Sequence, residues 1–440
     1  MMVVICLTFR RQTAETGFDR KTMKTLFFTF GCKVNQYDTQ MLREAFAAGY
    51  IPGAVAGPEL AVVNTCCVTA RAENDCLKLA RKLLRQGKKV WITGCLVKKE
   101  GEKLRQLLPG ASLYERDFLL MFLPACVLER TGPLKGISYF AGHVRAFVKV
   151  QEGCENRCSY CIVPLVRGAS RSRPEAEILR EIETLADNGY REIVLTGTDL
   201  GSYGKDTGTS LAGLLQRIFR GRRGLRIRLS SLELIRVSPE LLSILKESES
   251  FCPHFHIPLQ SGSDRVLRLM ARRYTAGQYL KAVAQIKKLF PEATITTDCL
   301  VGFPGEAESD FQLTCQVVEK VGFLKVHVFP YSVRPGTAAA FFPGKVPLKV
   351  IKERKSRLLA LAEAVSAQEK KSFLGTQQDL LTEKINGAVA SGHTGNYLPV
   401  RFTWQAGRVN EVVRVSLTGL TRGCFEGTIA FSGSAAAAHH

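Results

Sequence analysis

Three cysteines lie close together in the segment CENRCSYC, at Cys154, Cys158 and Cys161. Their number does not match the common cysteine sites. A structural zinc ion takes four protein ligands, often in two pairs, and a redox-active dithiol takes two. Three thiols on one short loop suit a metal group that keeps one coordination position open.

A [4Fe–4S] cubane is such a group. Three thiolates bind three of its irons, and the fourth iron can take the amino and carboxylate groups of S-adenosylmethionine. An electron from the cluster then cleaves a carbon–sulfur bond and gives a 5′-deoxyadenosyl radical. We therefore predict a radical-generating site at this loop, against the alternative of a zinc or purely structural loop.

A second set of cysteines follows strands near the amino terminus. Apolar runs predict strands over 25–32, 60–68 and 89–97, with helices over 37–50 and 72–88 between them. Parallel strands gather ligands at the edge where their carboxyl ends meet. Cys32, Cys66 and Cys95 each fall at such an end, so we expect one shared site rather than three unrelated buried thiols. Cys67 is the weaker candidate because neighbouring strand residues point to opposite faces.

The central region repeats a strand and a helix six times. A strand over 144–150 leads into CENRCSYC, and alternating helices and strands continue to residue 337. This order predicts a partial barrel whose chemistry lies at the carboxyl ends of its strands.

The last part of the chain no longer alternates strands with helices. A long basic helix over 349–375 precedes short β-type runs separated by glycines, which is typical of a small β-barrel that binds oligonucleotides. Tyr397 and Phe402, beside Arg401, either stack on RNA bases or belong to the barrel core.

Composition limits the class of protein. The 440 residues include 61 Lys and Arg against 40 Asp and Glu, giving a net charge of +21 that favours a polyanionic partner. Apolar runs fall short of the about 20 residues of a membrane span, and no secretory signal is evident, so we expect a soluble cytoplasmic protein with no membrane partner. Fourteen cysteines in such a protein indicate metal or cluster binding rather than disulfides.

A family resemblance joins these observations. The chain resembles the methylthiotransferases through FGCKVNQYDTQ, NTCCVT, TGC, CENRCSYCIVP, LTGTDLGSYG, SSLEL, HIPLQSGSDRVLRLMARRY, DCLVGFPGE and FPYSVRPGT. The implied fold class is α/β: an amino-terminal open α/β domain, a central partial (β/α)6 radical-SAM barrel and a carboxy-terminal all-β TRAM barrel. The expected boundaries are a disordered leader over 1–22, the amino-terminal domain over 23–132, the radical-SAM domain over 140–372, the RNA-binding TRAM domain over 373–432 and a tag remnant over 433–440.

The resemblance also implies roles for particular residues. Two [4Fe–4S] clusters are expected, an auxiliary one on Cys32, Cys66 and Cys95 and the radical one on Cys154, Cys158 and Cys161. The implied S-adenosylmethionine contacts are Tyr160 against the nucleoside, Thr198 and Asp199 at the methionyl end, and Glu233 and Gln260 along the cofactor. For these last four, buried strand-end polar residues are the alternative. Two cofactor molecules serve each turnover, one donating a methyl group and one being cleaved.

The expected substrate follows from the first motif. GCKVNQY resembles the branch that methylthiolates carbon 2 of N6-threonylcarbamoyladenosine at position 37 of tRNA, so the implied partners are an anticodon stem-loop, a flavodoxin- or ferredoxin-like electron donor and an unknown sulfur donor. Arg334 is a candidate for binding the threonyl carboxylate. The alternatives are isopentenyladenosine tRNA, an aspartate of a ribosomal protein, or a non-catalytic, metal-stabilised RNA-binding protein.

Overall fold

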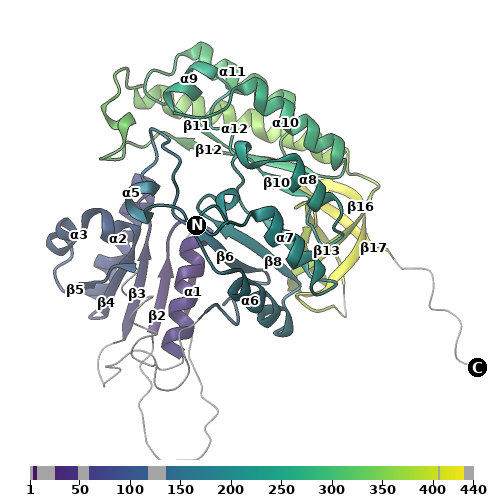
Figure 1. Ribbon diagram of the computed structural model, residues 1–440, viewed down its shortest axis with the longest axis horizontal. Coiled ribbons are helices and arrows are strands. Elements are labelled where there is room, and N and C mark those ends of the chain that lie inside the picture. Colours follow the sequence, from purple (N-terminus) through teal and green to yellow (C-terminus); the bar gives the residue numbers. More distant parts are fainter. Residues whose placement is uncertain (1–2, 7–24, 48–58, 117–134, 405–406, 431–440) are drawn as a thin grey trace, which may run out of the picture.

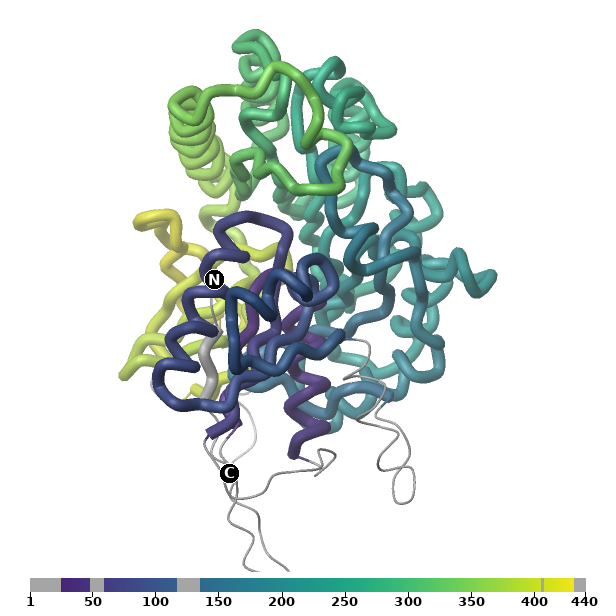
Figure 2. Tube along the Cα trace, turned by 90° about the vertical axis from the view of Figure 1, so that its left-hand side faces the viewer, coloured from purple at the N-terminus to yellow at the C-terminus, as the bar shows by residue number. Residues whose placement is uncertain are grey.

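The computed structural model describes residues 3–6, 25–47, 59–116, 135–404 and 407–430. Three units follow one another along the chain: an amino-terminal sheet, a central open barrel and a small closed barrel (Figure 1). The amino-terminal unit lies against the central barrel, as the view in Figure 2 also shows. Among the described residues, the helices lack the combination of length and apolar character that a membrane crossing requires.

The amino-terminal sheet has the order β1-β2-β3-β4-β5, with β1 antiparallel to β2 and the other pairs parallel. All six residues of β3 are buried, as expected of a central parallel strand covered on both faces. The Thr69 side chain caps α2 by accepting a hydrogen bond from the amide of Ala72. The elements are β1 (Val3–Cys6), β2 (Thr25–Thr29), α1 (Lys33–Ala47), β3 (Leu60–Thr65), α2 (Ala70–Arg85), β4 (Lys89–Gly94), α3 (Cys95–Leu107) and β5 (Ala111–Leu113).

Two predictions from the sequence differ from the observed structure of this sheet. The strand expected over 89–97 ends at Gly94, whose φ of +96° turns the chain, and Cys95 begins a helix that the sequence did not predict. The leader expected to be disordered contributes β1 at Val3–Cys6. The tag remnant over 433–440, and most of the linker near 128–136, lie outside the described residues.

The central unit is an open barrel of six parallel strands. Strands β6, β8 and β9 pair in one sheet and β10, β11 and β12 in another, and the bridge between Ser231 and His256 connects the two. Within the described residues, no pairing joins β12 back to β6, so one side stays open. The partial (β/α)6 barrel is thus confirmed. Its six strands are β6 (Ala146–Glu152), β8 (Glu192–Gly197), β9 (Arg226–Leu229), β10 (His254–His256), β11 (Thr294–Val301) and β12 (Lys325–Pro330), and the short strand β7 (Arg171–Ser172) pairs antiparallel with β6.

Helices cover the outside of this barrel. In α7, Leu211, Leu214, Leu215 and Ile218 lie on one buried face, the spacing that packs an amphipathic helix on a sheet. The helices are α5 (Val163–Arg167), α6 (Glu175–Asp187), η1 (Leu200–Ser202), α7 (Leu211–Arg220), η2 (Leu234–Arg236), α8 (Pro239–Lys246), α9 (Asp264–Leu269), α10 (Ala276–Leu289), α11 (Glu308–Val321), η3 (Ala338–Phe341) and α12 (Leu348–Lys371).

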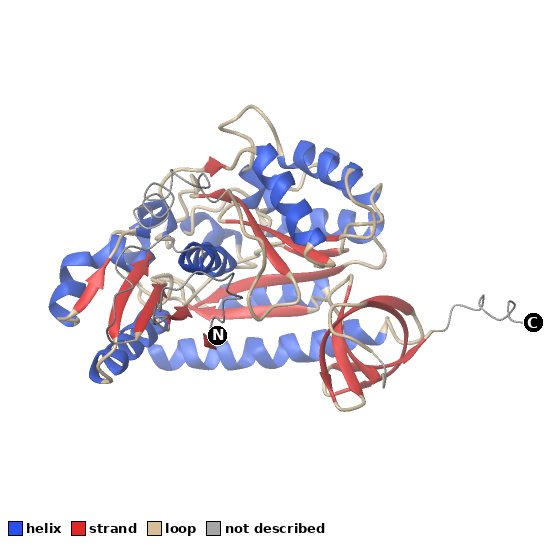
Figure 3. Cartoon of the chain, turned by 90° about the horizontal axis from the view of Figure 1, so that it is seen from below, coloured by secondary structure: helices blue, strands red, loops and turns tan. Residues whose placement is uncertain are grey.

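The long helix α12 runs along the central strands to the closed barrel (Figure 3). This barrel has the order β13-β14-β15-β17-β16, and its core includes Leu380, Val400 and Phe425. The small all-β barrel is confirmed. Its strands are β13 (Gln377–Asn386), β14 (Val389–Thr394), β15 (Pro399–Thr403), β16 (Val412–Thr421) and β17 (Cys424–Ile429).

Candidate active site

The amino-terminal cysteines converge at the carboxyl edge of their sheet. Cys32 is exposed, whereas Cys66 and Cys95 are buried. A Cβ added at Gly31 would lie 2.7 Å from both Cβ and Sγ of Cys66, so only glycine permits the turn before Cys32 to approach this closely. Burial raises the pKa of the Cys66 thiol to about 12, and the neighbouring Cys32 and Cys95 thiols add to the rise. The fold therefore brings this trio to one place.

Cys67 also belongs to this neighbourhood. Strand β3 ends at Thr65, so the alternation that was expected to turn Cys67 away does not apply. The Cys67 thiol is fully buried and donates a hydrogen bond toward Cys95, which lowers the pKa of Cys95, and nearby Arg167 lowers it further. The strand does not continue to Cys67, so both members of the Cys66–Cys67 pair lie beside Cys95, and the choice of Cys66 over Cys67 as a ligand stays a prediction.

The loop that carries the second trio is fixed by its backbone. Cys154 donates its amide to the Gly168 carbonyl at 3.1 Å, and Ser159 donates its amide to the Met270 carbonyl at 3.1 Å. Burial raises the pKa of the Cys154 thiol to about 11 and that of Cys161 to about 12, and the Cys158 thiol raises both further. Three thiols thus converge just past the carboxyl end of β6.

A positively charged side chain reaches this loop from a distant part of the chain. The Arg272 guanidinium donates to Cys158 Sγ at 3.3 Å and forms an ion pair with Glu233. A cationic side chain therefore lies against one of the three sulfurs of this loop. Arg272 lies within the motif HIPLQSGSDRVLRLMARRY, but the sequence alone assigned it no role because 114 residues separate it from Cys158.

The expected cofactor-lining residues lie around the same loop. The Tyr160 ring is 6.4 Å from that of Phe303, edge to face. Asp199 is buried and accepts a hydrogen bond from Asn156 at 3.0 Å. Gln260 has a φ of +61°, in the left-handed region where strain clusters at functional sites.

Unpartnered polar atoms test whether these residues fit S-adenosylmethionine. Thr198 Oγ1 and Asp199 Oδ1 are buried and have no hydrogen-bond partner within the described part of the chain. Such atoms are costly unless a ligand satisfies them. A hydroxyl and a carboxylate oxygen left open beside three thiols fit the amino and carboxylate groups of this cofactor.

Arg167 connects the two cysteine sites. It follows the second trio in α5, is 4% exposed, and donates to Glu152 at 2.6 Å and to Asn35 of α1. The carboxylate of Asp38 lies 3.5 Å from the same guanidinium. A buried ionic network therefore holds the amino-terminal unit against the start of the radical loop.

The three residues expected to contact the substrate all have partners within the protein. Arg334 is buried and bound to Glu73 at 2.6 Å and to the Cys67 carbonyl at 3.2 Å, so it braces the Cys66–Cys67 segment instead of facing a cavity. Phe402 is 4% exposed in the core of the closed barrel. Tyr397 is stacked between His254 and His393, with ring centroids 4.8 and 4.7 Å apart. Both aromatic residues serve packing, the alternative that the sequence left open.

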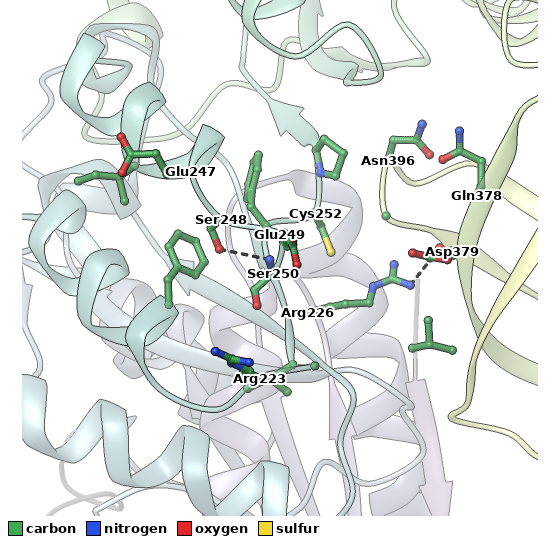
Figure 4. Close-up of a pocket in the computed structure, with 18 of the residues that line it drawn as sticks. Arg223, Arg226, Glu247, Ser248, Glu249, Ser250, Cys252, Gln378, Asp379 and Asn396 are labelled. Carbon is green, nitrogen blue, oxygen red and sulfur yellow. Dashed lines mark hydrogen bonds between the residues drawn. The ribbon is translucent and has the colours of Figure 1, made fainter.

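A large cleft lies away from both cysteine sites. Its volume is about 1090 Å³, and it lies between the amino ends of β9 and β10 and the closed barrel (Figure 4). Arg226 and Cys252 line one side, and Asp379 and Asn396 line the other. Because barrel chemistry takes place at the opposite strand ends, this cleft is not the reaction site.

An open (β/α)6 barrel with three thiols after its first strand defines a radical S-adenosylmethionine enzyme. Residues 148–318 match the Radical SAM superfamily, and residues 24–114 match the Uncharacterized protein family UPF0004. This class uses S-adenosylmethionine and a [4Fe–4S] cluster.

Relatives define the family more narrowly. The chain is 38% identical to the threonylcarbamoyladenosine tRNA methylthiotransferase MtaB of Chlamydia pneumoniae (84% of this chain, 90% of the relative) and 36% identical to MtaB of Thermotoga maritima (91% and 95%). It is also 36% identical to the tRNA-2-methylthio-N(6)-dimethylallyladenosine synthase of Moorella thermoacetica (91% and 96%). The chain belongs to the radical S-adenosylmethionine tRNA methylthiotransferase family.

Proposed function

We propose that the protein methylthiolates carbon 2 of N6-threonylcarbamoyladenosine at position 37 of tRNA. The observation that carries this proposal is the pair of cysteine trios, each at the carboxyl end of parallel strands and joined through Arg167. Two relatives with 36% or higher identity bear the threonylcarbamoyladenosine name, and the +21 net charge suits an RNA substrate.

Each trio has its own task in this proposal. Cys154, Cys158 and Cys161 would hold the radical cluster, and Cys32, Cys66 and Cys95 would hold an auxiliary [4Fe–4S] cluster. When bound, the clusters and S-adenosylmethionine supply the electron, the adenosyl radical and the methylthio group, with two cofactor molecules used per turnover.

Neighbouring side chains prepare these sites. Arg272 donates to the Cys158 sulfur and holds Glu233 in place beside the loop. Asp199 and Thr198 offer buried oxygens to the methionyl end of the cofactor. Arg167 stabilises negative charge at Cys95 and fixes the separation of the two trios.

The partners follow from the chemistry. In this proposal the anticodon stem-loop of tRNA presents the target adenosine, a flavodoxin- or ferredoxin-like protein supplies electrons, and the reaction takes place in the cytoplasm. A separate sulfur donor is required.

Nucleoside mass spectrometry tests the proposal. The protein, reconstituted without oxygen, is expected to hold about eight irons per chain. Expressed in a host that lacks its own enzyme, it should convert N6-threonylcarbamoyladenosine to the 2-methylthio derivative. If 2-methylthio-dimethylallyladenosine appears instead, the substrate is that named for the Moorella relative and the proposed substrate is wrong. If the protein holds about four irons per chain, the auxiliary cluster is wrong.

A further inference from the structure

Three neighbouring strands of the central barrel carry metal-ligand side chains on its inner wall. His256 ends β10, Asp298 lies within β11 and His327 lies within β12. Their strand neighbours Phe255 and Val328 are buried in the core together with residues of the outer helices. Alternate strand residues point to opposite faces of a sheet. His256, Asp298 and His327 therefore share the face that lines the barrel interior.

The strand register brings these three side chains together. Asp298 pairs directly with His327 across β11 and β12. His256 is in register with Thr296, two residues before Asp298. One ligand atom from each of the three side chains lies within 4.8 Å of the other two, and His256 Nε2 is 3.3 Å from Asp298 Oδ2. Two imidazoles and a carboxylate from three separate strands thus converge on one point.

This spacing suits a first-row divalent cation. Imidazole nitrogens and carboxylate oxygens bind zinc at about 2.0–2.2 Å, which sets tetrahedral ligands about 3.4 Å apart. The 3.3 Å between His256 and Asp298 already matches, and a rotation of the His327 side chain closes the remaining gap. Two histidines and one carboxylate are also the ligand set of catalytic zinc sites and of non-haem iron sites.

A second layer of contacts orients the His256 ring. Its Nδ1 lies 2.9 Å from the Thr296 hydroxyl, and the same hydroxyl lies 2.9 Å from Nε2 of buried His254. Histidines that bind metals commonly use one ring nitrogen for such a hydrogen bond, which aims the other nitrogen at the ion. In this ring the other nitrogen, Nε2, faces Asp298.

His327 has a ligand atom to offer. Its ring is half-buried and contacts the rings of His256 and Phe329, with centroids 5.9 and 6.5 Å apart. Its nitrogens make no hydrogen bond to any residue that the structure describes. Polar atoms in the interior of a protein usually have a partner. A nitrogen without one, within 4.8 Å of the His256 and Asp298 ligand atoms, is placed to complete an ion site.

The site is accessible from outside the barrel. A cavity of about 620 Å³ between β12, α12 and the closed barrel is lined by Thr296 and Lys325, among others. Through Thr296 it comes within one hydrogen bond of His256. Lys325 lies two residues before His327, about 6.8 Å along the strand, and its exposed side chain borders the cavity. An ion can therefore enter without opening the fold.

We propose that His256, Asp298 and His327 bind one first-row divalent cation, zinc or ferrous iron, on the inner wall of the barrel and separate from both cysteine trios. Three protein ligands leave at least one coordination position open, as in catalytic sites rather than closed structural ones. This position faces the barrel interior and takes an oxygen donor. The ion also joins β10, β11 and β12 beside the open side of the barrel. The proposal concerns ion binding and does not depend on which nucleoside the protein modifies.

Equilibrium dialysis of the cluster-loaded protein against Zn²⁺, without tRNA, tests the site. At equal iron content, wild type is expected to retain about one zinc per chain more than His327→Gln or Asp298→Asn. Thr296→Val, which removes the hydroxyl behind His256, should weaken zinc affinity about 10- to 100-fold. His143→Gln, which replaces a half-buried histidine outside the cluster, is the control and should bind zinc as wild type does.

Two further measurements locate and identify the ion. Anomalous diffraction at the zinc absorption edge should show a peak between the three side chains. Loading with ferrous iron should add a high-spin ferrous signal to the Mössbauer spectrum, distinct from the signals of the clusters, if the site takes iron. A zinc peak without this ferrous signal assigns the site to zinc.

Two results would contradict the proposal. If His327→Gln retains as much zinc as wild type, the ion is bound elsewhere, for example by cysteines that lack a cluster. If wild type retains none, the three side chains only pack against one another. His327→Gln decides the matter even if Asp298→Asn fails to fold, because the His327 nitrogens have no hydrogen bond to lose within the described residues. Absence of tRNA methylthiolation with zinc binding intact would refute the proposed function and leave this inference standing.

Discussion

Replacing Arg167 by Ala should separate cofactor cleavage from product formation. The guanidinium is 4% exposed and lies between Asn35 of the amino-terminal unit and Glu152 at the end of β6. It therefore contributes to the docking of two units that each carry a cysteine trio. We expect the variant to form 5′-deoxyadenosine but to transfer the methylthio group poorly.

The docking free energy lost in Arg167→Ala depends on the ion pairs that remain for Asp38 and Glu152. Lys149 still lies 2.5 Å from Asp38 and 3.2 Å from Glu152, so neither carboxylate loses all compensation. Loss of one partner of a buried ion pair costs 3–5 kcal/mol, and the lower end, about 3 kcal/mol, applies here. That free energy corresponds to about a 150-fold shift in the docking equilibrium.

The assay is the ratio of 5′-deoxyadenosine to methylthiolated tRNA under single-turnover conditions, with a thermal melt of the same protein. Both the ratio and the melting temperature should change in Arg167→Ala. Arg357→Ala is the matched control, because its ion pairs on α12 are exposed and contribute about 0–1 kcal/mol. An unchanged ratio in Arg167→Ala would refute the claim that this network couples the two sites.

Three other predictions concern single positions. Cys158→Ala should abolish 5′-deoxyadenosine formation while tRNA binding, measured by gel shift, persists; continued methylthiolation would overturn the ligand assignment. Cys66→Ala should preserve cofactor cleavage and stop methylthiolation, and full product formation would pass the ligand role to Cys67. Burial alone would raise the pKa of Glu192, but three arginines lower it to about 2. The ionised Glu192 carboxylate therefore contributes its full share of folding stability above about pH 4.5, and this contribution is lost as the pH falls toward 2. Glu192→Gln should therefore lower the free energy of unfolding by about 3 kcal/mol at pH 7 and weaken its dependence on pH below pH 4.5, as measured by denaturant titration. The same pH dependence of unfolding in wild type and variant would contradict this prediction.

Sequence spacing predicted the features that are local. The three thiols of CENRCSYC lie on one loop, and Cys32 and Cys66 follow strands whose apolar character is plain, so their convergence could be inferred from parallel pairing alone. The helix that begins at Cys95 was missed because ITGCLV reads as a continuing apolar strand. Only the positive φ of Gly94 shows where the strand ends.

Side chains brought in from distant segments could not be predicted. Arg272 and Cys158 are 114 residues apart, and Arg167 and Asn35 are 132 residues apart. Arg334 is a further example: its motif gave no sign that it pairs with Glu73 of another unit. No spacing pattern carries this information, since the partner depends on how the units dock.

The stacking of Tyr397 between His254 and His393 affects how this protein can be dissected. Tyr397 holds a φ of +70°, and the carbonyls of Thr394 and Gly395 before it accept hydrogen bonds from buried Arg228. A truncation that removes the last barrel would strip this arginine of two acceptors and expose the floor of the central barrel. Loss of tRNA affinity in such a fragment would then reflect damage to the catalytic unit, so point substitutions on the outer surface of the small barrel are the sounder probe of its contribution.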